Sequence, residues 1–261
     1  MTNPTDFGGY GHIARQFDDR EGQYHSPWVF EWLIENLSPH KGSAHVLEVG
    51  CGTGNFTRHL GATGIGTVWG VDPDPRMIAI AEESEDPIRY HCAPTNHMPF
   101  HTGQFDGVVA HYSFEHFCHD QASIDEVKRV MRPGGVFMTV TWPMSELSLR
   151  RGKTIRPFAT TLPELDQAGD MTSVGYAPLL SALGFRDVIS RKQRVVIEYT
   201  IEQAFRYMLR SGLISGVPEQ RTPELHTALR ELCEREADSN GKLYHEIDVI
   251  ADLALAPATF C

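Results

Sequence analysis

From residue 44 onward, short apolar runs alternate with stretches of helical periodicity, and this alternation restricts the possible folds most strongly. The apolar runs are His45–Val49, Thr67–Val71, Ile88–Cys92, Phe105–Ala110 and Gly135–Trp142, and the helical patterns include Asp74–Glu83 and Ser123–Met131. Apolar strands that are separated by helices are typical of a parallel sheet with helices on both faces. The sequence therefore predicts an α/β fold with a core over residues 44–142.

The flanks of this core have a more helical pattern. A lead-in over residues 1–43 contains a helix that begins after Ser26-Pro27. After the core the pattern predicts a helix, a strand, two amphipathic helices and a last strand, at residues 175–183, 185–199, 201–210, 224–236 and 243–254. We expect a single domain over residues 1–261, in which residues 143–261 complete the sheet.

The composition excludes several classes of protein. Hydrophobic residues make up 41% of the chain, which is too many for a disordered protein. The net charge of −11 argues against non-specific nucleic-acid binding, and no apolar run approaches the ~18 residues that span a bilayer. The five cysteines are widely spaced without a C-x-x-C pair, and the N-terminus has no secretory pattern. We therefore expect a cytoplasmic protein with free thiols and without a zinc site.

A glycine-rich turn follows the first strand and is the most informative motif. Glu48 precedes three glycines at alternate positions, Gly50, Gly52 and Gly54, and a helix follows them. Glycines allow a tight turn and a close approach of a ligand to the backbone, and the helix supplies free N–H groups. A dinucleotide fingerprint fits less well, because it needs a glycine where Asn55 stands. No Gly-Lys-Ser/Thr follows, which excludes a Walker phosphate loop.

The segment Glu48–Gly54 resembles the first motif of the class I S-adenosylmethionine-dependent methyltransferases, and five further segments resemble that family in order and spacing. These segments are Val71-Asp72, His91 to Phe100, Phe105–Val109, Glu115-His116-Phe117 and Arg129–Gly135. The resemblance implies a Rossmann-like three-layer α/β/α sandwich with a helical cap. It also implies a mostly parallel seven-stranded sheet of order 3-2-1-4-5-7-6, with the last strand antiparallel.

The resemblance implies S-adenosylmethionine as the cofactor and S-adenosylhomocysteine as its product. Asp72 at the end of the second strand would accept hydrogen bonds from both ribose hydroxyls. Glu48 would support the loop or the cofactor ammonium. The loop residues that would wrap the amino-acid end are Gly50, Cys51, Gly52, Gly54 and Asn55. Pro73 and Met77 would pack on the adenine, although Met77 fits a plain core position equally well.

Cys92 departs from the family pattern, which usually places an acid before Ala93 to accept from the adenine amino group. A thiol is a poor acceptor. We therefore expect the adenine to be held mainly by the backbone N–H of Ala93 and by stacking. In an alternative interpretation, Cys92 is a buried core thiol.

Histidines are concentrated in one part of the chain. Six of the 13 lie between residues 91 and 119: His91, His97, His101, His111, His116 and His119. The last three do not share one face of a helix or strand, so we expect no metal. His111 follows the fourth strand and His116 belongs to the Glu-His pair, which makes both candidate bases. Alternatively, His111 only lines the cofactor pocket, and His116 only caps the next helix.

The flanks are expected to bind the methyl acceptor, through insertions at about residues 143–170 and 200–240. The segment from Tyr10 to Asp18 resembles the family's leading element, so Tyr10 and Tyr24 are candidate substrate contacts. Residues 143–195 contain eight basic and five acidic residues. Arg150 and Arg151 in this segment are candidates to attract an anionic acceptor, although a solvated basic loop would look the same.

The sequence thus predicts an enzyme that transfers a methyl group to an oxygen or nitrogen, less readily a carbon, of a small molecule by in-line displacement. We expect a monomer or homodimer with no nucleic-acid or membrane partner. Three alternatives remain open. They are a methyltransferase acting on RNA or protein, a non-catalytic S-adenosylmethionine-binding module and a nicotinamide-dependent dehydrogenase.

Overall fold

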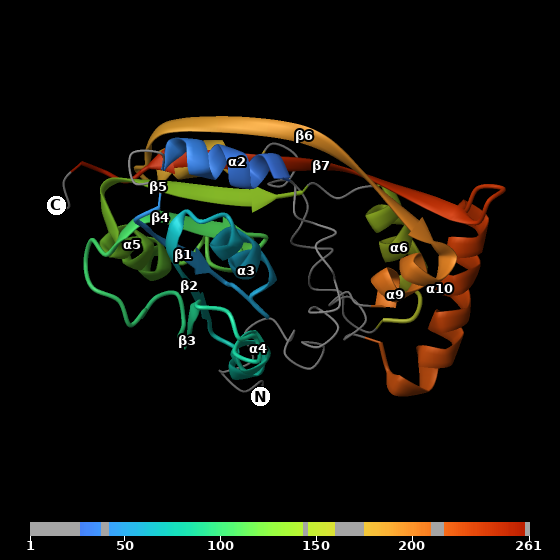
Figure 1. Cartoon of the computed structure of the whole chain (residues 1–261). Coiled ribbons are helices and arrows are strands. Elements are labelled where there is room, and N and C mark those ends of the chain that lie inside the picture. The colour runs from blue at the N-terminus through green and yellow to red at the C-terminus, as the bar shows by residue number, and fades with distance from the viewer. Residues whose placement is uncertain (1–26, 38–41, 143–145, 160–174, 210–216, 259–261) are drawn as a thin grey trace. The chain divides into compact units, whose positions relative to one another are not determined.

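A computed structural model describes residues 27–37, 42–142, 146–159, 175–209 and 217–258 (Figure 1). The chain forms two compact units. The core unit consists of residues 1–141, 175–192 and 250–261, and the second unit consists of residues 142–174 and 193–249. The last two strands of the sheet extend from one unit into the other.

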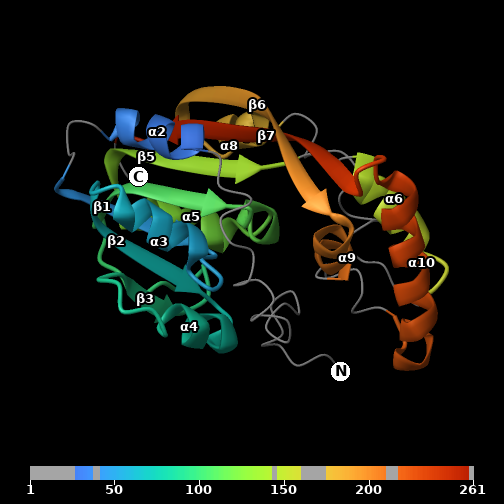
Figure 2. The same ribbon diagram turned by 45° about the vertical axis from the view of Figure 1, so that its right-hand side comes forward.

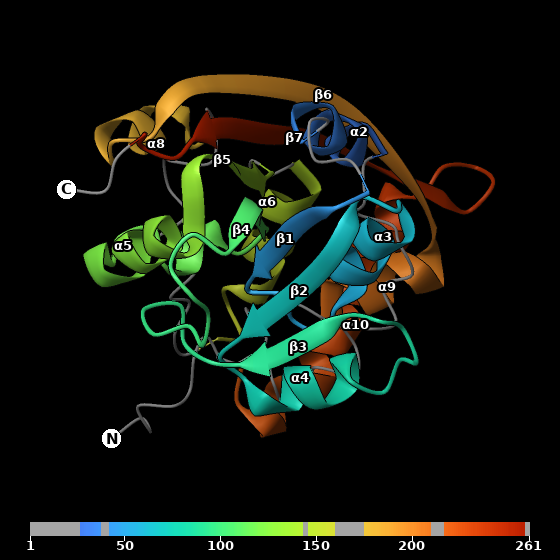
Figure 3. The same ribbon diagram turned by 60° about the vertical axis from the view of Figure 1, so that its left-hand side comes forward.

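Seven strands form the sheet in the order β3-β2-β1-β4-β5-β7-β6, which confirms the predicted order. They are β1 (Ala44–Val49), β2 (Gly66–Asp72), β3 (Arg89–Cys92), β4 (Phe105–His111), β5 (Met131–Thr141), β6 (Arg186–Thr200) and β7 (Lys242–Leu255). Strands β1, β2 and β3 lie side by side and pair in parallel (Figure 3). The pairing of β5 with β7 is antiparallel, as predicted. The carboxyl ends of β1, β2 and β4 therefore share one edge of the sheet.

Five helices of the core unit are described: α2 (Pro27–Asn36), α3 (Asn55–Ala62), α4 (Pro75–Ala81), α5 (Gln121–Val130) and α8 (Ala177–Ala182). Each predicted helix of this unit is present, with small shifts at its ends. Helix α5 begins two residues before its predicted start, because Asp120 accepts from the N–H groups of Ala122 and Ser123 as an N-cap. Strand β5 begins at Met131 rather than at Gly135, so the Pro-Gly-Gly segment lies inside the strand.

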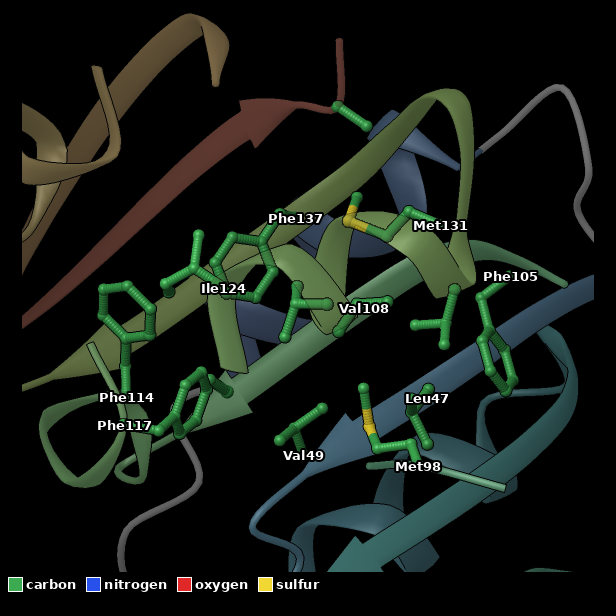
Figure 4. Packing of buried hydrophobic residues seen from close by; sticks show 14 of the residues in the cluster. Leu47, Val49, Met98, Phe105, Val108, Phe114, Phe117, Ile124, Met131 and Phe137 are labelled. Atoms are coloured by element: carbon green, nitrogen blue, oxygen red, sulfur yellow. The ribbon is translucent and has the colours of Figure 1, made fainter. Parts of the chain in front are cut away.

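Buried aromatic residues join the sheet to its helices. The rings of Phe114 and Phe117 meet edge to face at 5.2 Å, and Phe114 packs on Phe137 of β5 at 5.6 Å (Figure 4). Helix α5 contributes Ile124 and Val127, both fully buried, to the same cluster. Their three-residue spacing places both side chains on one face of the helix. This packing fixes the segment after β4, from which candidate site residues project.

The described residues of the second unit form three α-helices and a 3-10 helix together with parts of β6 and β7. The helices are α6 (Glu146–Ile155), α9 (Ile201–Leu209), η5 (Glu219–Arg221) and α10 (Thr222–Glu236). Helix α10 packs against both α6 and α9 (Figure 2). Its buried residues Leu225, Leu229 and Leu232 recur at helical spacing. The two amphipathic helices predicted here are confirmed, whereas α6 was not predicted as a helix. None of the helices in the described ranges is long and apolar enough to cross a membrane.

Candidate functional site

The loop Gly50–Gly54 turns sharply away from the end of β1. Gly50, Gly52 and Gly54 have φ angles of 72°, 54° and 79°, which side chains other than glycine rarely adopt. The N–H groups of Gly50 and Cys51 both donate to the carbonyl of Val71, at 2.8 and 3.0 Å. These bonds tie the loop to the end of β2. The three alternate glycines in the sequence therefore correspond to a turn that is anchored to the neighbouring strand.

The three glycines face different surroundings. A methyl carbon on Gly50 would lie 2.5 Å from Cβ of Ser113, and one on Gly54 would lie 2.5 Å from Oη of Tyr90. Apart from its chain neighbours, a methyl carbon on Gly52 would have no atom of the described residues within 4 Å. Gly50 and Gly54 are thus packed against the protein, whereas Gly52 faces open space. A ligand can approach the loop backbone at Gly52.

The carboxylate of Asp72 lies between the loop and the start of α4. One oxygen accepts from the N–H of Gly52 and the other from the N–H of Asp74, both at 2.9 Å. Burial raises the pKa of this carboxyl, and the two N–H bonds oppose the rise. A carboxylate offers about four lone-pair sites, so both oxygens can also accept from ribose hydroxyls. The residues present therefore fit the cofactor role predicted for Asp72.

Glu48 lies beneath the loop and is 2% exposed. It accepts a short hydrogen bond from the hydroxyl of Thr57 in α3. Burial raises its pKa from 4.5 to about 8, although the bond from Thr57 opposes the rise. Because Glu48 joins β1 to the first turn of α3, this geometry favours loop support. A contact with the cofactor ammonium stays a prediction.

Four residues predicted to contact the adenine lie around the end of β3 and the start of α4. Met77 is buried in α4, while Cys92 is exposed and its thiol donates to the carbonyl of Pro73 at 3.7 Å. This exposure contradicts the interpretation of Cys92 as a buried core thiol. The N–H of Ala93 donates to the carbonyl of Asp72 at 3.1 Å. A hydrogen bond from Ala93 to adenine would have to share this donor.

Two other loop residues have distinct surroundings. Cys51 is buried, and burial raises the pKa of its thiol well above the ordinary value. A methyl carbon on Gly70 would meet both Cys51 Sγ, at 2.9 Å, and the Tyr90 ring, at 2.8 Å. Asn55 is half-buried as the first residue of α3. Cys51 therefore packs the loop onto the sheet, and Asn55 lies where the helix N–H groups begin.

His111 is the last residue of β4 and belongs to an aromatic stack. Its ring lies 4.1 Å from that of Phe56 at an interplanar angle of 17°, and 4.1 Å from that of Tyr112. Phe56 stacks in turn on Phe30 of α2 at 4.7 Å. The sequence did not identify these partners, because they come from separate elements. The only local signal was an aromatic residue directly after the glycine-rich turn.

His116, the second candidate base, is exposed in the short helix η3 (Phe114–His116). Burial dominates the raised pKa of Asp72, and His116 opposes that rise through a small electrostatic effect, so this histidine belongs to the electrostatic surroundings of the carboxylate. Within the described ranges, no three His, Cys, Asp or Glu residues are placed to hold a metal ion. The two histidines thus differ in their setting, His111 in a ring stack and His116 near Asp72.

The predicted substrate residues fall in other places. Tyr10 and Tyr24 lie outside the described residues. Arg150 and Arg151 belong to α6 in the second unit. Arg150 forms an ion pair with Glu236 of α10, and Arg151 lies over the ring of Tyr207. The structure thus brings the predicted loop residues and Asp72 together, and it gives the two arginines different partners.

Comparison with known proteins agrees with this fold and loop. A model of a methyltransferase domain family matches residues 47–139. An O-methyltransferase of Penicillium expansum, cnsE, is 28% identical over 137 residues, which cover 49% of this chain and 49% of that protein. The ubiquinone/menaquinone biosynthesis C-methyltransferase UbiE of Cupriavidus pinatubonensis is 26% identical over 226 residues, covering 80% of this chain and 88% of that protein.

The match to the Penicillium protein spans about half of that protein's length. A solved structure of an S-adenosylmethionine-dependent methyltransferase from Aquifex aeolicus has a similar fold, with a TM-score of 0.56 at 14% identity. The similarity covers 94% of this chain and 98% of that chain. The order of the strands, the glycine loop beside Asp72 and the family match agree with one another. Residues 47–139 therefore match a methyltransferase domain, and the chain has the fold of the class I S-adenosylmethionine-dependent methyltransferases.

Proposed function

We propose that this chain is an enzyme that transfers the methyl group of S-adenosylmethionine to an oxygen or nitrogen atom of a small molecule. The observation that carries the proposal is the open space at Gly52 beside the carboxylate of Asp72, which two backbone N–H groups hold in place. This arrangement lies at the carboxyl edge of a parallel sheet, where ligands of α/β proteins bind. It supports a site for a ligand that has both vicinal hydroxyls and a polar tail.

When bound, S-adenosylmethionine would supply a methyl group on a sulfonium, which is reactive toward direct displacement. The protein's part is to bind and orient. Asp72 would fix the ribose, and the loop around Gly52 would hold the amino-acid end through backbone contacts. Methyl transfer requires the nucleophile in line with the methyl at about 3 Å. The bonds of the loop to the carbonyl of Val71, and the Glu48–Thr57 bond that joins the elements on either side of the loop, support this requirement.

A base would assist an acceptor that begins protonated, and His111 is the favoured candidate. Its ring stacks on Phe56 and contacts the ring of Tyr112, so its orientation is restricted. A fixed imidazole can take a proton at one ring nitrogen near neutral pH. His116 is exposed and lies in the electrostatic surroundings of Asp72, so we assign it to the cofactor side rather than to proton transfer.

Replacing Asp72 with asparagine should weaken cofactor binding about tenfold, which corresponds to ~1.4 kcal/mol. In the wild type, two backbone N–H groups each donate to one oxygen of the Asp72 carboxylate. The amide of asparagine keeps one acceptor oxygen, but its NH2 group is a donor and would face the other backbone N–H. Calorimetric titration with S-adenosylhomocysteine measures the effect. The control is Asp125→Asn, which removes an exposed carboxylate bonded to Gln121. Equal affinities for the two variants would contradict the role of Asp72.

The proposed activity can be tested with S-adenosylmethionine labelled in its methyl group. The purified protein is incubated separately with a small-molecule extract, with total RNA and with denatured protein. Label that appears only in the small-molecule arm supports the proposal, whereas label in RNA or protein replaces it with a macromolecular acceptor. Cofactor binding without product in any arm would favour a non-catalytic module. Binding of NAD in place of S-adenosylmethionine would overturn the cofactor assignment.

The names of the similar proteins leave the acceptor atom open, because cnsE is named an O-methyltransferase and UbiE a C-methyltransferase. We favour oxygen or nitrogen, since these atoms carry the protons that a histidine base can accept. Mass spectrometry of the labelled product identifies the atom. A product methylated at carbon would revise this part of the proposal and leave the cofactor assignment intact.

A further inference from the structure

Arg151 on α6 is a half-buried cation that has no counterion among the described residues. Its Nε is buried without a hydrogen-bond partner there, and its guanidinium carbon lies 5.2 Å from the centre of the Tyr207 ring. The neighbouring Arg150 differs, because it forms an ion pair with Glu236. The two adjacent arginines of the second unit therefore have different surroundings, and only Arg150 has a carboxylate partner in the described structure.

The Tyr207 ring that Arg151 contacts belongs to a group of three rings. Tyr207 of α9 lies 5.3 Å from the imidazole of His245 in β7, and Tyr199 at the end of β6 stacks on Tyr207 at 5.6 Å. His245 is 2% exposed. Burial, together with the charge of Arg151, lowers the pKa of His245 to about 4. The imidazole is therefore neutral at physiological pH, and Arg151 is the positive group that faces it.

A partly buried cation without a partner is unfavourable, because it loses hydration and gains no opposite charge. The contact with the Tyr207 face offsets only part of this loss. A guanidinium binds carboxylate and phosphate groups best, with several N–H donors in one plane. Surroundings of low polarity strengthen that attraction. Among the described residues, the environment of Arg151 is thus that of a cation whose opposite charge a ligand can supply.

We propose that Arg151, Tyr207 and His245 form a binding site for the oxyanion group, a carboxylate or a phosphate, of a small ligand. The guanidinium supplies the charge, the tyrosine ring orients it, and the neutral imidazole supplies a polar contact without competing for the anion. The site itself does not depend on methyl transfer. Only the identification of its ligand with the methyl acceptor rests on the proposed function.

The test follows the imidazole of His245 by NMR in the full-length protein labelled with nitrogen-15 at histidine. Phosphate and acetate are titrated separately at constant ionic strength, so the two arms separate the two kinds of oxyanion. We expect a saturable shift of the His245 signals and a rise of its pKa, because a bound anion offsets the charge of Arg151. Arg151→Met should weaken anion binding about tenfold or more. If Arg151→Met binds the anions with the same affinity as the wild type, the proposal is overturned.

Lys153→Met is the matched control, since Lys153 is an exposed cation on the same helix. The Lys153→Met variant should bind the anions with the affinity of the wild type. Equal loss of affinity in Lys153→Met and Arg151→Met would indicate a non-specific effect of charge and would overturn the proposed site. Arg151→Lys keeps the charge but loses the planar donors, so we expect intermediate affinity. Calorimetry with S-adenosylhomocysteine verifies that each variant still folds and binds the cofactor. If the anions do not bind but methyl transfer is observed, only the anion site is refuted. If the anions bind but no methyl transfer is observed, only the proposed activity is refuted.

Discussion

Gly54→Ala is expected to destabilise the protein by about 2–5 kcal/mol, from backbone strain together with overpacking. The new methyl carbon would lie 2.5 Å from Oη and 2.7 Å from Cζ of Tyr90, and the φ of +79° is unfavourable for alanine. Tyr90 has little freedom to move, because its ring also lies against Gly70. Urea unfolding monitored by circular dichroism measures the loss. A variant as stable as the wild type would show that the contact with Tyr90 is readily relieved.

Gly52→Ala is the matched control, because it has the same kind of backbone strain without the steric contact. In the described part of the chain, only the neighbouring residues of the loop lie within 4 Å of the new methyl carbon, so the loss of stability should be only about 1–2 kcal/mol. This methyl group would instead project into the space where we expect the cofactor. The control should therefore lose cofactor affinity out of proportion to its stability. Similar effects of both substitutions on stability and binding would contradict the different roles of the two glycines.

A second substitution tests the cause of the Gly54 effect. Tyr90→Leu removes the hydroxyl and the outer ring atoms, which are the three atoms nearest to a methyl carbon on Gly54. The double variant Gly54→Ala/Tyr90→Leu should therefore lose less stability than the two single variants lose in total. Additive losses would mean that only the φ angle of Gly54 matters, and not the packing of Tyr90.

Glu48→Gln is expected to change how stability depends on pH. The folded-state pKa of Glu48 is raised from 4.5 to about 8, so the folded protein holds a proton that the unfolded chain releases. The stabilisation from this proton is complete below about pH 4.5 and is lost as pH rises to about 8. The free energy of unfolding should thus decrease by up to ~1.4 kcal/mol per pH unit within this window. Glutamine at this position cannot release a proton, so its contribution stays constant.

The difference between wild type and Glu48→Gln, measured by urea unfolding at several pH values, isolates this contribution from all other titrating groups. The wild type should lose stability relative to the variant between about pH 5 and 8. Glu85→Gln serves as the control, because Glu85 is exposed. A constant difference between wild type and Glu48→Gln across the window would show that Glu48 does not hold this proton. If Glu48→Gln is less stable than the wild type by an additional amount that is the same at every pH, that amount reports on the lost bond from Thr57. The change of the difference with pH still tests whether Glu48 holds the proton.

The order of elements in the core was predictable because each element has a local signature. Apolar runs identified β1, β2 and β4, and the glycines identified the turn before α3. Element ends were less predictable. The cap formed by Asp120 and the early start of β5 depend on hydrogen bonds that a periodicity pattern does not include. Helix α6 of the second unit had no comparable signature in the sequence and was not predicted.

The sequence alone determined the α/β class, the place of the glycine-rich loop and the acid at the end of β2, because these depend on residue types at short, fixed spacing. The tertiary structure decided the partners. It paired Glu48 with Thr57, placed Tyr90 against Gly54 and stacked Phe56 on His111. It also left Arg151 without an ion pair in the described residues while giving Arg150 one. Most of these contacts join residues from different elements, whose distances depend on strand register and helix packing rather than on local sequence.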